Sequence, residues 1–293
     1  MEQLIAVIGG DARYLELIRQ MQALPNVSIV LVGYDKLEQS FTGLKQTDFN
    51  EIQPADLDVV ILPITGTDEY GNIEAVFSDR PIQLTEDWFK QLDKSAIIFT
   101  GMANPYLTEV TEQVGLELVP LLNRDDVAIY NSIPTAEGAI MMAIEHTDYT
   151  IHSSKVVVTG FGRIGHTIAN KFSSLGAKVS VASHHLSDLA RITEMNLHAI
   201  PLDQLTEHLD NCDILINTIP ALVIKQEAIE KLPAHTVIID LASKPGGTDF
   251  EFANKRGIKA ILAKSLPGVV APKTSGKILA NVIIQILEGR RLA

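Results

Sequence analysis

The stretch Lys155-Val156-Val157-Val158-Thr159-Gly160-Phe161-Gly162-Arg163-Ile164-Gly165 reads as an apolar strand that runs into a glycine-rich turn. The segment HTIANKFSSLGA that follows has helical character, and KVSVAS then supplies a second strand, so the pattern G-x-G-x-x-G lies inside a complete βαβ unit. We therefore predict a dinucleotide site in which Gly160 permits the tight turn, Gly162 lets the backbone approach a pyrophosphate, and Gly165 lets helix and strand pack closely.

A comparable alternation of strands and helices precedes this motif. Short β-branched, apolar runs recur along both halves of the chain: LIAVIGG, SIVLVGY, DVVILPI, AIIFTG and ELVPLL before residue 123, and KVVVTG, KVSVAS, DILINT, TVIIDL and KAILA after residue 154. Continuous apolar strands that alternate with helices are typical of parallel sheets covered on both faces. We predict an α/β protein with two doubly wound, Rossmann-like domains in series.

The length of 293 residues suits two domains that each bury their own core. The predicted organisation is an N-terminal cleft domain over 1–130, a hinge helix over 131–148 and a nucleotide-binding domain over 149–273. Apolar residues at helical spacing predict the hinge helix, with Ser132 or Thr135 as its cap and Pro134 in its first turn. A last amphipathic helix, over 274–290, is predicted to cross back and pack on the first domain.

Composition excludes several classes of protein. The chain is 46% apolar and 20% charged, as in soluble globular proteins, and no apolar run approaches the roughly 18 residues of a membrane helix. Met1 is followed almost at once by a strand, so we expect no export signal and a cytoplasmic protein. Cys212 is the single cysteine, which excludes an internal disulfide and a cysteine-based zinc site. We predict no metal site, and the net charge of -12 without a basic cluster argues against a nucleic-acid partner.

The residues after KVSVA bear on the choice between NAD and NADP. An NAD site usually places Asp or Glu there, about 20 residues after the glycines, to bind a ribose hydroxyl. This chain has Ser183-His184-His185 instead, and Asp188 follows inside the predicted start of the next helix. Ser183 and the histidines can donate hydrogen bonds to a 2′-phosphate, and Arg163 and Arg191 add cations. We favour NADP over NAD; the alternative for His184 and His185 is a solvated turn.

Further candidates follow other predicted strands, because open α/β sheets bind ligands at the C-terminal ends of their strands. The nucleotide-side candidates are Phe161, Ile164, Thr218, Ile219, Pro220, Ala242 and Ser243. The substrate-side candidates are Asp11, Arg13, Thr65, Thr100, Gly101, Asn131, Ser132, Thr135 and Lys273. Asp11 has helix capping as its alternative role. With Lys244, the cations of these two sets favour an anionic substrate held between the domains.

Several blocks of the sequence resemble the larger, dehydrogenase-like component of bacterial dipicolinate synthase. They are AVIGGDAR, RDDVAIYNSIPTAEGAI, GFGRIG, DLARITEM, INTIP, IDLASKPGGTDF and LPGVVAPKTSGKILANVI, in order from Ile5 to about Ile284. YNSIPTAEG and LASKPGGTDF are much more specific than the glycine motif. The chain departs from that family at His184, where an arginine is expected, so the resemblance does not fix the strength of the NADP preference.

The resemblance implies an oxidoreductase that converts a dihydrodipicolinate-type intermediate to pyridine-2,6-dicarboxylate, with NADP as the hydride acceptor. It implies a partner in the smaller, flavoprotein-like B subunit, and work in the mother-cell cytoplasm during sporulation. A homodimer is compatible with this assignment. Glu137 and Asp240 are candidates for the general base, and Lys244 is a third candidate catalytic residue, as a carboxylate binder. The structural alternatives are a first-turn helix acid for Glu137 and a buried acceptor of turn amides for Asp240.

Two other functions fit the same architecture. One is a 2-hydroxy-acid-type carboxylate dehydrogenase, although the sequence does not reveal the His with a carboxylate partner that such an enzyme needs late in its nucleotide domain. The other is a non-catalytic, NADP-binding regulatory subunit, which the absence of hydride transfer in the complex would favour.

Overall fold

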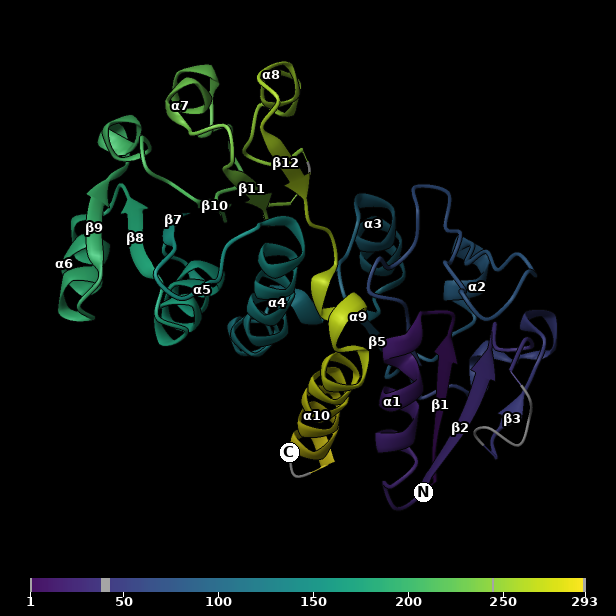
Figure 1. Cartoon of the computed structure of the whole chain (residues 1–293). Helices are drawn as coiled ribbons and strands as arrows, with labels where there is room; N and C mark the ends of the chain where they lie inside the picture. The colour runs from purple at the N-terminus through teal and green to yellow at the C-terminus, as the bar shows by residue number, and fades with distance from the viewer. Residues whose placement is uncertain (1, 38–42, 244, 292–293) are drawn as a thin grey trace. The chain divides into compact units, whose positions relative to one another are not determined.

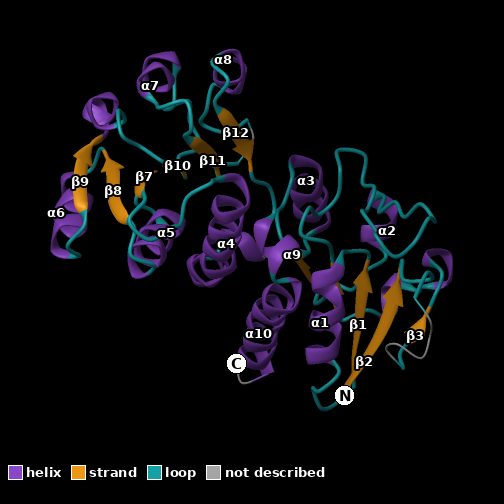
Figure 2. Ribbon diagram, viewed as in Figure 1, coloured by secondary structure: helices purple, strands orange, loops and turns teal. Residues whose placement is uncertain are grey.

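The computed structural model describes residues 2–37, 43–243 and 245–291, which form two compact α/β units (Figures 1 and 2). Unit 1 comprises residues 1–128 and 271–293, and unit 2 comprises residues 129–270. Each unit has a parallel sheet of six strands between helices, which confirms the predicted fold class. In the described part of the chain, no helix combines the length and the apolar character that crossing a bilayer requires.

Unit 1 is built on a sheet with the order β3-β2-β1-β4-β5-β6. Its strands are β1 (Gln3–Ile8), β2 (Val27–Val32), β3 (Lys45–Gln46), β4 (Val59–Ile61), β5 (Ile97–Thr100) and β6 (Glu117–Pro120). Its helices are α1 (Ala12–Met21), α2 (Glu86–Lys90), α3 (Pro105–Val114) and α10 (Pro272–Arg291), with short 3₁₀ helices η2 (Phe49–Glu51), η3 (Pro54–Asp56) and η4 (Leu121–Asn123). Alternate residues of β1 enter two separate cores, because side chains of a strand point to opposite faces. Helices α1 and α10 cover one face and α2 and α3 the other.

Unit 2 repeats this plan with the order β12-β11-β10-β7-β8-β9. Its strands are β7 (Lys155–Thr159), β8 (Lys178–Ser183), β9 (His198–Pro201), β10 (Ile214–Asn217), β11 (Val237–Asp240) and β12 (Lys259–Leu262). Its helices are α4 (Asp125–His146), which begins in unit 1, α5 (Arg163–Ser174), α6 (Leu186–Glu194), α7 (Gln226–Lys231), α8 (Phe250–Lys255) and α9 (Leu266–Val270), with the 3₁₀ helix η5 (Leu202–His208). Strand β7 pairs with β8 on one side and β10 on the other, so the strand order reverses beside it. Ligands of doubly wound sheets bind at such a reversal.

The predicted hinge helix needs a correction. Helix α4 begins at Asp125, and its first turn contains two acids, which favour a helix N-terminus. Pro134 therefore lies inside the helix and not in its first turn. Ser132 and Thr135 do not cap it: Ser132 Oγ donates to the Ile129 carbonyl at 2.6 Å and Thr135 Oγ1 to the Asn131 carbonyl at 2.8 Å. These bonds satisfy the hydroxyls within a continuous helix.

The last helix confirms the predicted return to the first domain. Helix α10 packs along α1 in unit 1, where the two helices lie side by side in Figure 1. Its apolar stripe, which includes Leu279, Val282, Ile283 and Leu287, is buried in the same core as Leu17 of α1. A Cβ on Gly276 would overlap the backbone of Arg13, so this glycine lets the helices approach closely.

Cys212 illustrates the core of unit 2 and gives a testable result. Burial raises the pKa of its thiol to about 12, and its side chain lies in the apolar layer beneath β10. Because the thiolate is the reactive form, we expect a disulfide reagent at mildly alkaline pH to label the unfolded chain and spare the native one. Rapid stoichiometric labelling of the native protein would show that the thiol is accessible.

Candidate functional site

The glycine turn of unit 2 has the geometry that the motif predicts. Gly160 has φ of +92°, a left-handed conformation that side chains rarely adopt, and a Cβ there would lie 2.9 Å from Ile219 Cγ1. A Cβ on Gly165 would overlap the carbonyl oxygen of Gly160 and lie 2.9 Å from its carbonyl carbon. By contrast, a Cβ on Gly162 would meet no protein atom within 4 Å. Two glycines thus serve the fold, whereas the space over Gly162 is open.

Helix α5 begins directly after this glycine turn. Gly162 is its N-cap and, without a side chain, makes no side-chain cap hydrogen bond. Arg163 and Ile164 form the first turn, and Phe161 stacks beside His166 with ring centroids 5.2 Å apart. A helix of 12 residues adds the positive end of its dipole. Its N-terminus therefore suits a pyrophosphate.

A buried polar network fixes the neighbouring strand ends. Asn217, at the end of β10, accepts from Thr159 Oγ1 at 2.7 Å and donates its Nδ2 to Asp240 Oδ1 at 2.9 Å. Asp240, at the end of β11, also accepts from the Ala242 N–H at 3.0 Å, the Gly247 N–H at 2.8 Å and Thr248 Oγ1 at 2.7 Å. The side chains of Asn217 and Asp240 are both 0% exposed. This network positions the loops that contain Thr218, Ile219, Pro220, Ala242 and Ser243.

The same bonds give Asp240 a structural role and a measurable effect. Asp240→Asn would turn an amide NH₂ toward at least one N–H group that now donates to the carboxylate, so at least one hydrogen bond is lost and two donors face each other. We expect the free energy of unfolding to fall by about 2–4 kcal/mol in chemical denaturation. The exposed Asp210→Asn serves as the matched control and should change it by less than about 0.5 kcal/mol. Equal effects of the two substitutions would contradict the network.

The end of β8, where the sequence predicts contacts to the ribose, differs from the sequence expectation. Ser183 ends β8 and is buried, whereas His184 and His185 are exposed, with ring centroids 3.8 Å apart and the ring planes tilted by 43°. Ser183 Oγ donates to Asp188 Oδ2 at 2.7 Å. An acid therefore does reach the strand end, from the first turn of α6. Asp188, five residues after Ser183, was the residue in the sequence that could have indicated this acid. Only the geometry of α6 shows that its side chain points back toward Ser183. Arg191 pairs with Glu194 at 3.0 Å on the exposed side of α6.

The candidate catalytic residues have different surroundings. Glu137 is exposed on α4, while its neighbours Ala136 and Ala139 pack into the core of unit 2. Asp240 is enclosed by its hydrogen bonds. Lys244 lies outside the described residues.

Two substrate-side candidates meet at the start of α1. Asp11 is the N-cap, accepting from the Arg13 N–H at 3.0 Å, which confirms its capping role. Arg13 is buried and also donates Nε to Asp11 Oδ1 at 2.9 Å, with an ion pair from its Nη2. Lys273, in the first turn of α10, lies near α1 as well. The pKa of Glu16 is lowered to about 2, mainly by hydrogen bonds from Arg19 and Gln20, with Lys273 contributing.

The remaining candidates of unit 1 are mainly structural. Thr100 is 0% exposed and donates to the Pro63 and Met102 carbonyls at 3.2 and 3.0 Å. A Cβ on Gly101 would overlap the backbone of Ile64. Thr65 is exposed and donates to Glu74 Oε2 at 3.3 Å, beside a hollow of about 340 Å³.

The three candidates on α4 also lie within hydrogen-bond networks. Ser132 Oγ lies 2.7 Å from Thr167 Oγ1 of α5, besides its bond to the helix backbone. Asn131 supplies the carbonyl that accepts from Thr135. Ser132 therefore ties α4 to the helix that follows the glycine turn, whereas the bond between Thr135 and Asn131 lies within α4.

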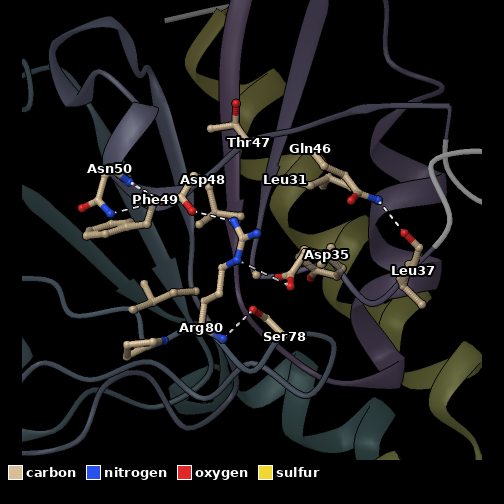
Figure 3. A pocket seen from close by; sticks show the side chains of 15 residues that line it. Leu31, Asp35, Leu37, Gln46, Thr47, Asp48, Phe49, Asn50, Ser78 and Arg80 are labelled. Atoms are coloured by element: carbon tan, nitrogen blue, oxygen red, sulfur yellow. Dashed lines mark hydrogen bonds and ion pairs between the residues drawn. The ribbon is translucent and has the colours of Figure 1, made fainter.

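The glycine turn of unit 1 is covered by the chain itself. Gly10 donates to the Glu74 carbonyl at 2.9 Å, and its own carbonyl accepts from the Val76 N–H at 3.1 Å. A pyrophosphate would have to displace this segment. A hollow of about 560 Å³ lies beyond the end of β2. Its Arg80 pairs with Asp48 at 2.6 Å and approaches Asp35 at 3.8 Å. Figure 3 shows Arg80 between these two acids. Because the glycine turn of unit 1 is covered and the space over Gly162 is open, unit 2 is the better candidate for a dinucleotide site.

Comparisons with known proteins match the N-terminal and C-terminal parts of the chain to two different domain families. The family model for the N-terminal domain of the dipicolinate synthase A-subunit matches residues 4–122, and that of the D-isomer specific 2-hydroxyacid dehydrogenase NAD-binding domain matches residues 133–244. The dipicolinate synthase A-subunit of Bacillus subtilis (strain 168) is 50% identical over 283 residues, or 97% of this chain and 95% of that protein. The crystal structure of the Bacillus halodurans counterpart has a TM-score of 0.94 at 46% identity, covering 98% of both chains. That of the Bacillus subtilis protein has a TM-score of 0.94 at 48% identity, covering 100% of this chain and 98% of the other.

Proposed function

We propose, because this chain belongs to the dipicolinate synthase A-subunit family, that it is the dehydrogenase component of a dipicolinate synthase. Its reaction is the oxidation of a dihydrodipicolinate-type intermediate to pyridine-2,6-dicarboxylate, with NADP as hydride acceptor. The observation that carries the reaction type is the glycine turn, with its open space over Gly162 at the N-terminus of α5. A dehydrogenase needs a nicotinamide cofactor, and this site has the geometry to hold its pyrophosphate.

The reaction requires mainly that the protein orient the substrate ring. Aromatisation removes two hydrogens from the substrate ring: one leaves as hydride with both bonding electrons, and the other leaves as a proton. NADP, when bound, supplies the hydride acceptor. The protein must hold the ring in register and accept the proton. Because the product is an aromatic pyridine, the oxidation is strongly favourable and needs no large charge stabilisation.

Glu137 is the proton acceptor that we propose. Its carboxylate is exposed on α4, so a substrate can reach it. Asp240 is less suitable, since its oxygens accept four hydrogen bonds in a fully buried position. We therefore assign Asp240 a positioning role for the loops after β10 and β11. We assign Glu137 the role of accepting the proton.

Cations of unit 1 are proposed to bind the substrate carboxylates. Arg13 and Lys273 both lie where α10 packs against α1. Asp11 holds Arg13 in a fixed orientation, and Lys273 is exposed. A dicarboxylate supplies the complementary charge.

NADP is the proposed cofactor. Its 2′-phosphate would meet the exposed imidazoles of His184 and His185 after β8, with Arg163 in the first turn of α5. Imidazoles donate hydrogen bonds to phosphate oxygens and carry charge when protonated. A smaller, flavoprotein-like B subunit is the proposed partner, and the mother-cell cytoplasm during sporulation is the proposed location.

A 2-hydroxy-acid dehydrogenase is less well supported. Such an enzyme needs a His–carboxylate pair near the nicotinamide. In the described part of unit 2, His235 and Asp213 form such a pair at 3.0 Å, but they precede β11 and β10. They therefore lie at the N-terminal edge of the sheet, opposite the strand ends that bind the nucleotide.

The test is a binding and turnover experiment on the full chain. NADP should bind to the chain alone, and NADPH should appear when dihydrodipicolinate is supplied together with the partner subunit. Binding of NADP without any NADPH formation in the complex would instead support a regulatory role.

A further inference from the structure

We propose that Asp188 is a specificity-determining residue that weakens the discrimination of this site for NADP over NAD. The inference rests on the proposed function, because it assumes that the adenosine ribose lies at the end of β8. Open α/β sheets of this strand order bind the ribose there.

The position of the carboxylate carries the argument. Asp188 belongs to α6, yet its Oδ2 lies 2.7 Å from Ser183 Oγ at the last residue of β8. In NAD sites an acid at this strand end accepts the ribose hydroxyl that bears the phosphate in NADP. Here the acid comes from the following helix, but its charge reaches the same place.

Ser183 cannot compensate for this charge. Its hydroxyl proton is donated to Asp188, and its oxygen accepts from the His185 N–H at 3.3 Å. A hydroxyl has one proton, so Ser183 has no second donor for a phosphate. In this arrangement the Ser183 hydroxyl donates to Asp188 and not to a 2′-phosphate.

Other charged groups near the end of β8 also affect the relative affinity for NADP and NAD. His184 and His185 are exposed beside the strand end, and Arg163 lies in the glycine turn. Arg191, also on α6, is paired with Glu194 at 3.0 Å. The 2′-phosphate therefore gains donors from the imidazoles and faces Asp188 as a like charge, whereas NAD lacks the phosphate that this carboxylate repels.

A plain structural role for Asp188 is a first-turn acid that stabilises α6 through the helix dipole. That role would operate in any side-chain direction and would not affect the choice of cofactor. The ratio of the two cofactor affinities therefore separates the two roles, while thermal stability alone does not.

The test is equilibrium binding of NAD and NADP to the wild-type chain and to Asp188→Asn. The asparagine keeps the size of the side chain, and its amide oxygen can still accept from Ser183. We expect the affinity for NADP relative to NAD to rise about ten-fold, as removal of one nearby like charge implies. Asp210→Asn, an exposed acid that precedes β10 at the opposite edge of the sheet, should leave the ratio unchanged.

The outcomes are distinguishable. A ten-fold rise in the ratio with unchanged thermal unfolding supports the role of Asp188 in cofactor choice. A ratio within two-fold of wild type, with both cofactors still bound, overturns this inference and leaves the proposed function intact. If wild type binds neither cofactor, the proposed function fails and this inference fails with it.

Discussion

Gly165→Ala is expected to destabilise unit 2 strongly. The new methyl group would overlap the carbonyl oxygen of Gly160, and the overlapped atom belongs to a backbone turn that a side-chain rotation cannot relieve. The turn is also anchored, because the Gly160 N–H donates to the Ala182 carbonyl of β8 at 2.9 Å. We expect a loss of at least about 3 kcal/mol in the free energy of unfolding, measured by chemical denaturation.

Gly162→Ala is the matched control three residues earlier. Its φ of -74° and ψ of -163° are open to alanine, and the added Cβ would meet no protein atom within 4 Å. The fold should therefore persist, while affinity for NADP falls because the methyl group occupies the proposed pyrophosphate space. Stability of Gly165→Ala equal to that of Gly162→Ala would contradict the assigned roles of the two glycines.

Glu137→Gln is expected to reduce turnover by at least about a hundred-fold, the usual contribution of a positioned general base. The substitution keeps the shape of the side chain but removes its capacity to accept a proton at neutral pH. Affinity for NADP should remain, because Glu137 lies on α4 and the proposed nucleotide site consists of other elements of unit 2. Steady-state kinetics of the complex, together with NADP titration of the chain, provide both measurements.

The control for this prediction lies on the same helix. Glu145→Gln changes another exposed acid of α4 and should leave turnover within about two-fold of wild type, as expected for a surface position. If Glu137→Gln keeps comparable turnover, another group accepts the proton.

Most of the fold could be predicted from the sequence because the central strands are buried on both faces. Runs such as VVV and ILI are continuous apolar segments, and the glycines after β7 have steric requirements that few other residues meet. The two strands that the apolar runs did not predict, β3 and β9, stand at sheet edges. They are short and partly exposed, with sequences KQ and HAIP, so no apolar run in the sequence predicts them.

The site was less predictable because its details depend on side-chain direction. Asp188 stands five residues after the strand, and only the first turn of α6 brings its carboxylate back to Ser183. Asp240 looked equally suited to base catalysis and to binding turn amides until its partners were known. The start of α4 was misplaced because Pro134 favours a first turn, yet the acids at Asp125 and Asp126 begin the helix earlier.

In the proposed reaction, hydride from a dihydrodipicolinate-type ring passes to NADP bound at the glycine turn of this chain. The most direct measurement follows NADPH and pyridine-2,6-dicarboxylate together in the complex with the partner subunit, for wild type and for Gly162→Ala. The predicted result is equal amounts of the two products with wild type, and parallel loss of both with Gly162→Ala. Formation of the dicarboxylate at the wild-type rate without NADP would contradict the claim.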